Sequence, residues 1–138
     1  MDKTLNMISL CKKAGSVQIG EENSAAAIRA GKAKVLFLAS DSSDNAKRRA
    51  EGFIFGTNVL ISTLPYTKLE ISNAVGKTGC SMLAVTDIGF AVNIARGIGS
   101  EPLYNELKLK EEKTKKRRLE MKAHVRNVRQ GKGRSKHE

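Results

Sequence analysis

The chain has 138 residues, two cysteines and a formal net charge of +11. This length favours a single domain, and two cysteines do not make the disulfide framework of a small secreted protein. No apolar run approaches the roughly 20 residues of a membrane span, so we expect a cytoplasmic protein without membrane contact.

The N-terminal part of the chain reads as a helix followed by a βαβ unit. A helix is expected over residues 1–14, because apolar side chains recur there at helical spacing. A strand at 17–19 and a glycine turn at 20–23 precede an alanine-rich helix at 24–30 and a strongly apolar strand at 35–39. The two strands of such a unit usually pair in parallel.

The alternation of helices and short apolar strands then continues. The expected elements are a helix at 44–55, a strand at 59–61, a helix at 67–75, a strand at 82–85 and a helix at 88–96. Continuously apolar strands between helices indicate a sheet that is covered on both faces. We therefore predict an α/β fold, a three-layer α/β/α sandwich around a central mixed sheet, in a domain spanning residues 1–100.

Residues 101–138 are predicted to form a basic extension. Residues 1–105 carry 12 Lys and Arg against 9 Asp and Glu, whereas residues 106–138 carry 13 against 5. Good helix formers predict an exposed helix over 104–130, in which apolar residues such as Leu107 are too sparse for a core stripe. We expect disorder over 130–138. A basic arm of this kind points to a polyanion, with nucleic acid ahead of an anionic membrane.

Several residues are candidates for contacts with RNA. Gly20 either lets a backbone approach closely or is an ordinary turn glycine, and Glu22 and Asn23 either read guanine edges or cap the following helix. Amide N–H groups at that helix start attract anions. Lys32 and Lys34 flank the apolar strand, where they contact phosphate or are merely solvated. The densest cationic run of the tail should contact phosphates; this run comprises Lys115, Lys116, Arg117 and Arg118. Contacts to phosphates position a protein on a nucleic acid without reading its sequence.

Three stretches carry a family resemblance: residues 19–41 with two glycines, residues 69–76 (LEISNAVG) and residues 85–91 (VTDIGFA). In their order and spacing they resemble the kink-turn-binding ribosomal protein family, the L-seven-Ae/L-thirty-e group, and its bacterial YlxQ-type branch in particular. The resemblance covers roughly residues 3–96. It implies an α/β/α sandwich that binds RNA through two loops.

In the first of these loops, the family's Gly, small residue, Asn and Glu read sheared G·A pairs, and a following Lys meets phosphate. This chain keeps Gly20 but places Glu21, Glu22 and Asn23 at the next three positions, with Ala26 at the position of the Lys. Two acidic residues would thus face the RNA, while Asn23 could still donate to and accept from a base edge.

The second loop that the resemblance implies spans residues 76–80. It contributes Gly76, Lys77 and Thr78, and Lys77 is placed for phosphate in a loop that lacks the family's apolar character.

Together these features predict an RNA-binding protein, associated with the ribosome or another structured RNA, whose core recognises a bent or looped motif by shape and base edges. The alternative is a protein-interaction adaptor of the same fold that has lost kink-turn recognition, which the acidic Glu21–Glu22 pair favours. We expect no enzymatic activity, because no nucleophile–base pair, metal-ligand cluster or phosphate cradle is recognisable. We also expect no cofactor, no metal and a monomer.

Overall fold

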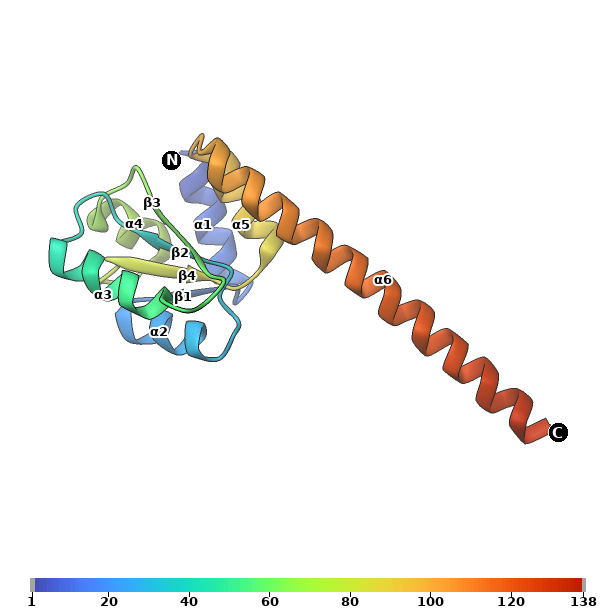
Figure 1. Cartoon of the computed structure of the whole chain (residues 1–138). Helices are drawn as coiled ribbons and strands as arrows, with labels where there is room; N and C mark the ends of the chain where they lie inside the picture. Colours follow the sequence, from blue (N-terminus) through green and yellow to red (C-terminus); the bar gives the residue numbers. More distant parts are fainter. Residues whose placement is uncertain (1, 138) are drawn as a thin grey trace.

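The computed structural model describes residues 2–137, with side chains described as far as His124. Within this range the chain forms six helices and four strands (Figure 1). They are α1 (Lys3–Lys13), β1 (Val17–Ile19), α2 (Glu21–Arg29), β2 (Val35–Leu38), α3 (Asp44–Ile54), β3 (Leu60–Thr63), α4 (Lys68–Val75), β4 (Met82–Val85), α5 (Ile88–Gly97) and α6 (Glu101–His137).

The four strands form one mixed sheet in the order β1-β4-β2-β3. β4 is antiparallel to both of its neighbours, so that Val85 lies opposite Val17 on one side and Val35 on the other. β2 and β3 pair in parallel. The predicted mixed sheet is confirmed, but the predicted pairing of the first two strands is wrong. β1 and β2 run in the same direction, but β4 lies between them. The insertion of β4 depends on residues far along the chain, so local sequence does not reveal it.

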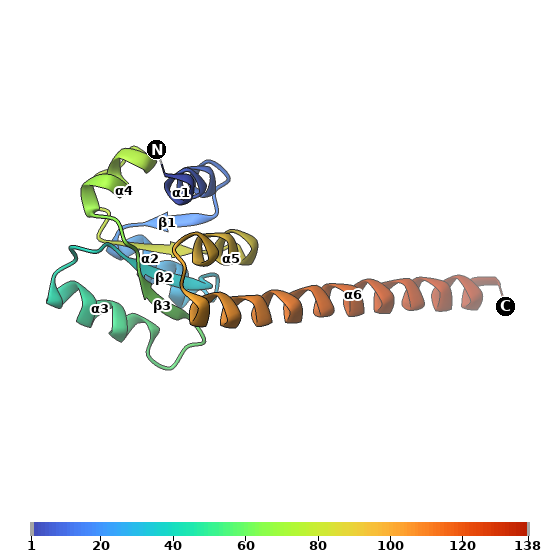
Figure 2. The same cartoon turned by 90° about the horizontal axis from the view of Figure 1, so that it is seen from above.

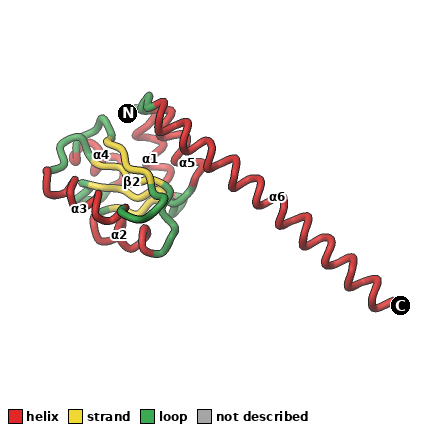
Figure 3. Tube along the Cα trace, in the orientation of Figure 1, coloured by secondary structure: helices red, strands yellow, loops and turns green. Residues whose placement is uncertain are grey.

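The sheet is covered on both faces, as its apolar strands predict. One core packs α1, α4 and α5 against the strand side chains represented by Val35 and Phe37. The other core packs α2 and α3 against Leu36, Leu38 and Met82. Figure 3 shows the strands enclosed between helices on both sides. The three-layer α/β/α sandwich is therefore confirmed.

The helix starts follow the sequence signals. Ser43, Thr67 and Asp87 cap α3, α4 and α5, and Thr67 forms a capping box with Glu70. α2 differs, since it begins at Glu21, three residues before its predicted start. Residues 21–23 are thus the first turn of a helix and not part of a loop.

The start of α6 belongs to the core. Leu103 and Leu107 are buried against the α1–α4–α5 side, which corrects the prediction that Leu107 is exposed. Beyond these turns α6 leaves the domain as one long helix (Figure 2). The α6 backbone continues to His137, beyond residue 130, where the sequence predicts that disorder begins. Disorder of residues 130–138 in solution stays a prediction. The domain boundary at residue 100 also stays a prediction.

Both cysteines, Cys11 and Cys80, are buried and unpaired. Burial and the nearby Asp87 carboxylate raise the pKa of the Cys11 thiol to about 12, so this thiol is not a nucleophile at neutral pH. No helix within residues 2–137 is both long and apolar enough to span a bilayer.

Candidate nucleic-acid interface

The start of α2 and a loop that is far from it in sequence meet at one end of the sheet. The amide N–H of Gly20 donates to the Met82 carbonyl at 3.0 Å, directly after the loop over residues 76–81. The Ser81 carbonyl in turn accepts from the Ala39 amide at 2.9 Å and from the Ser42 hydroxyl at 2.8 Å. We call this end of the sheet, formed by residues 20–23 and 76–81, the α2 edge. It unites the two loops that the family resemblance implies.

Gly20 shapes the start of α2. Its φ of 94° and ψ of 167° lie in a region that is essentially restricted to glycine. α1, α3, α4 and α5 each have a side-chain N-cap, whereas Gly20 offers none, and no side-chain cap is present at α2 in the described structure. The first amide N–H groups of α2 therefore keep their capacity to donate to an anion or a carbonyl oxygen from outside.

Glu21 does not point toward an outside partner. Arg49 of α3 donates through Nε to Glu21 Oε1 and through Nη2 to Glu21 Oε2, the latter at 3.1 Å. Such two-point contact between guanidinium and carboxylate fixes geometry as well as charge. The acidic pair of the α2 edge is thus reduced to one uncompensated carboxylate, that of the exposed Glu22.

Asn23 is held over the end of β1. Its side-chain Nδ2 donates to the Ile19 carbonyl at 3.0 Å, and the residue is exposed. One of the two Nδ2 hydrogens makes this bond. The Asn23 amide also carries a second Nδ2 hydrogen, which can donate, and Oδ1, which can accept. An amide fixed in this way is suited to a hydrogen bond with a base edge.

The loop over residues 76–81 is anchored at both ends. Gly76 ends α4 in the left-handed conformation with φ 70°, and Lys12 of α1 donates from Nζ to the Val75 carbonyl at 2.5 Å. At the other end, the buried Cys80 thiol donates to the Lys77 carbonyl at 3.4 Å. The side chains of Lys77 and Thr78 are exposed, so a braced loop presents them to solvent.

The opposite end of the sheet carries a cluster of cations. An open groove of about 830 Å³ lies between α6, the turn before β2 and the turn before β3. We call it the α6 groove, and define it by its charged lining residues: Lys34, Glu106, Lys110, Lys113 and Arg117.

Lys110 is the central cation of the α6 groove. Its Nζ donates to the Asn58 carbonyl, which ties α6 to the turn before β3. Burial lowers the pKa of Lys110, and the positive charges of Lys34 and Lys113 lower it further against the opposing effect of Glu106. Lys34 and Lys113 thus lie close enough to Lys110 to disfavour its charged form.

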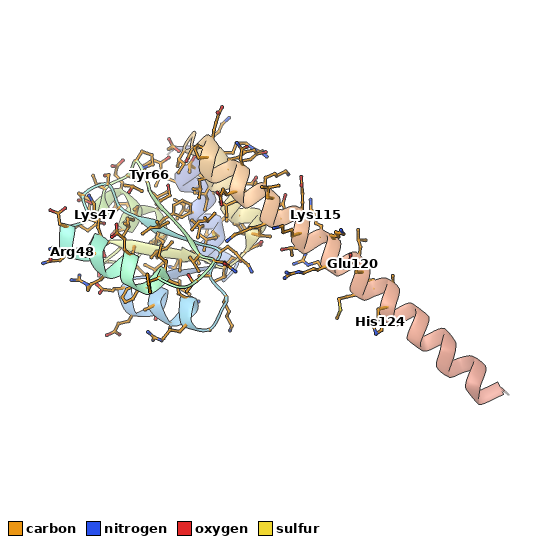
Figure 4. All side chains as sticks on the ribbon, viewed as in Figure 1. Lys47, Arg48, Tyr66, Lys115, Glu120 and His124 are labelled. Atoms are coloured by element: carbon orange, nitrogen blue, oxygen red, sulfur yellow. The ribbon has the colours of Figure 1, made fainter. Side chains whose placement is uncertain are left out.

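The structure divides the predicted binding residues into three sets. Residues 20–23 and 76–78 lie together at the α2 edge, whereas Lys34 lies with Arg117 in the α6 groove and Lys32 lies exposed on the adjoining turn. The remaining tail candidates are exposed on α6 outside the groove, where Lys115 lies 3.8 Å from Glu111. In Figure 4, Lys115 projects from the free length of α6, far from Lys47 and Arg48 of α3.

Sequence reasoning missed the partners that complete both regions. Arg49 was visible as part of three consecutive cations at 47–49, but its pairing with Glu21 depends on how α2 and α3 pack. Lys110 and Lys113 were visible in the tail, but no local signal places them beside Lys34.

Comparison with known proteins gives consistent similarities. An RNA-binding protein YlxQ of Enterococcus faecium is 35% identical over 89 residues, which cover 64% of this chain and 84% of that protein. The large ribosomal subunit protein eL30 of Neurospora crassa is 28% identical over 83 residues, which cover 59% of this chain and 76% of that protein. No family model matches the chain. A solved structure of a Bacillus halodurans protein of unknown function superposes with a TM-score of 0.64 at 22% identity, covering 71% of this chain and 98% of the other, and supports the fold.

Proposed function

Because the chain belongs to the L-seven-Ae/L-thirty-e family of ribosomal-type RNA-binding proteins, in its bacterial YlxQ-type branch, we propose that it binds a bent or looped structured RNA through the α2 edge. Cations of α6 add contacts to the RNA backbone. The observation that carries this proposal is the hydrogen bond from Gly20 to Met82, which sets the uncapped start of α2 beside the exposed loop over residues 76–81.

The chemistry of the α2 edge supports recognition of base edges. Backbone N–H groups at the start of α2 can donate to phosphate or base oxygens, aided by the helix dipole. The Glu22 carboxylate can accept from the N–H groups of a guanine, and the fixed Asn23 amide can donate and accept at a neighbouring base. Lys77 can meet a phosphate from the second loop. Bases become accessible to such groups where RNA is bent, looped or unpaired.

The ion pair between Glu21 and Arg49 favours RNA binding over the adaptor alternative. The adaptor interpretation depends on two acidic side chains that would repel RNA. Arg49 compensates one of them, so the charge at the α2 edge opposes RNA less than the sequence indicates. We therefore regard RNA as the partner. The protein would bind this RNA in the ribosome or in a particle related to it.

The test compares two RNAs and two variants of the full-length protein. Wild-type protein should bind a kink-turn RNA more tightly than an unbent duplex of equal length. Asn23→Ala should weaken kink-turn binding by about 10- to 100-fold, because a good base-edge contact is worth about 1–3 kcal/mol. The matched control, Asn105→Ala, removes an exposed amide from α6 and should change neither affinity. Equal affinity of the wild type for both RNAs would overturn recognition by the α2 edge.

A further inference from the structure

We propose that the α6 groove is a second binding site for RNA, which holds consecutive phosphates of a strand at the end of the sheet opposite the α2 edge. This inference deepens the proposed function and rests on RNA being the partner. It assigns the extension a defined role, because the groove needs residues from both the domain and α6.

The groove is built by one face of α6. Glu106, Lys110, Lys113 and Arg117 follow one another at intervals of four, three and four residues, so their side chains project from the same side of the helix. That side faces the turn that carries Lys34. Because Lys110 also donates to the Asn58 carbonyl, α6 is fixed against the domain at this point. The contact of Lys110 thus sets the position of this part of α6 relative to the turn before β3.

The charge of the groove calls for an anionic ligand. Four cations converge on it and one carboxylate, Glu106, opposes them, which leaves a local charge of +3. Burial lowers the pKa of Lys110, and repulsion from Lys34 and Lys113 adds to this lowering while Glu106 opposes it. A phosphate placed among Lys34, Lys110 and Lys113 would offset the repulsion that Lys34 and Lys113 exert on Lys110.

The lining also indicates which part of an RNA would bind. None of the described residues that line the groove is aromatic, so no platform for base stacking is present there. The uncharged lining combines aliphatic side chains such as Val59 and Leu60 with polar ones such as Thr57, and can accommodate ribose. From Lys110 to Arg117 the helix rises about 10 Å. This span is long enough for the groove to meet more than one phosphate of a strand.

The decisive experiment compares two triple variants of the full-length chain. Lys34→Gln, Lys113→Gln and Arg117→Gln together neutralise the groove and spare Lys110, which ties α6 to the domain. The matched control combines Lys3→Gln, Arg48→Gln and Lys68→Gln, which removes the same charge from exposed positions of the domain outside the groove. Binding of a single-stranded oligouridine, which lacks a bent motif, is measured at several salt concentrations.

The groove variant should flatten the dependence of log K on log[salt] by about 2, because each phosphate contact on a single strand contributes about 0.7. The control variant should flatten it by less than about 0.7, the equivalent of one contact. Equal flattening by both variants would overturn the groove and leave RNA binding intact. If the wild-type protein bound neither oligouridine nor kink-turn RNA, the proposed function would fall together with the groove.

A second readout follows the Lys110 amine by nuclear magnetic resonance. Oligouridine should raise the pKa of Lys110 in the wild type and in the control variant, but not in the groove variant. Inorganic tripolyphosphate at equal phosphate concentration should raise it less, because it lacks the riboses that we place against the uncharged lining. An equal response to tripolyphosphate would assign the groove to small polyphosphates and overturn its assignment to an RNA strand.

Discussion

Arg49 of α3 contacts both carboxylate oxygens of Glu21 in the first turn of α2 and so joins two helices on the same face of the sheet. The side chains are half and one-third exposed, so the pair should add only about 0.2–1 kcal/mol to stability. Its greater effect concerns charge, because it compensates a carboxylate at the place where we propose that RNA binds.

Arg49→Gln should weaken binding of kink-turn RNA several-fold more than Arg48→Gln does. Both changes remove one positive charge from α3, but Arg48 contacts Asn45 in its own helix, and only the loss of Arg49 uncovers Glu21. A bare carboxylate about 4 Å from a phosphate costs on the order of 1 kcal/mol in water. Glu21→Gln should correspondingly tighten binding. Affinities measured at one fixed salt concentration check this, and equal effects of the two arginine variants would contradict it.

Gly97→Ala should destabilise the domain by about 1–3 kcal/mol, the usual cost of overpacking a close contact. A Cβ at Gly97 in α5 would lie 2.1 Å from Oγ1 and 3.1 Å from Cβ of the buried Thr4 in α1, so the two helices would have to separate. Gly52→Ala is the control, since a Cβ there meets nothing within 4 Å and should stabilise α3 by about 0.5–1 kcal/mol. Urea unfolding measures both, and a Gly97→Ala protein as stable as the wild type would refute the contact.

Leu107→Ala should lower the free energy of unfolding by about 2–5 kcal/mol, as expected for a large-to-small change in a core. Leu107 is 0% exposed and packs within the α1–α4–α5 core. Leu109, two residues further along α6, is 59% exposed, so Leu109→Ala should change stability by less than about 0.5 kcal/mol. Thermal unfolding of the two variants tests whether the start of α6 is part of the domain. Similar small effects would place the whole helix outside it.

Stability should fall in acid partly through Asp2. A hydrogen bond from the Tyr66 hydroxyl at 2.8 Å and one from the Thr4 amide hold the pKa of Asp2 below its ordinary value. A carboxyl whose pKa is depressed on folding stabilises the fold above its unfolded pKa, and this contribution is lost as pH falls through the folded value. Asp2→Asn keeps an N-cap for α1 but removes the charge.

The Asp2→Asn variant should therefore be less stable than the wild type at pH 7, and the difference should shrink below about pH 4, where the carboxyl begins to protonate. Urea unfolding of both proteins across pH checks this. A gap that is constant down to strongly acidic pH would show that the ionised carboxyl contributes nothing. At alkaline pH a separate loss is expected, because burial and the bond to Asp2 raise the pKa of Tyr66. That contribution is lost as pH rises through the raised value.

Most of the fold could be predicted because its signals are local. Apolar runs located all four strands to within two residues, and Asp87 and Thr67 cap the helices that they precede. The strand order could not be predicted, because the insertion of β4 between β1 and β2 depends on packing across the whole chain. The burial of Leu107 was missed for the same reason, since two leucines suffice when a helix docks through only its first turns.

The candidate site likewise has features that could be predicted from the sequence and features that could not. Gly20 and the loop over residues 76–81 could be located from glycine spacing and from the family resemblance, and whether they bind RNA remains a prediction. The orientation of Glu21 toward Arg49 and the meeting of Lys34 with Lys110 join residues that are distant in sequence. Composition revealed that the tail is basic, but only the fold decides which face of α6 lies against the domain.

The central place of β4 has a consequence for synthesis of the chain. β1 pairs only with β4, in contacts such as Val17 with Val85 that join positions roughly 70 residues apart. At about 5–20 residues per second, a nascent chain carries β1 unpaired for roughly 3–13 s before β4 is made. During that interval the edges of β1 and β2 that β4 later covers are open to other chains. The α6 groove draws on residues synthesised later still, so the growing polypeptide closes its sheet before it completes a second surface for RNA.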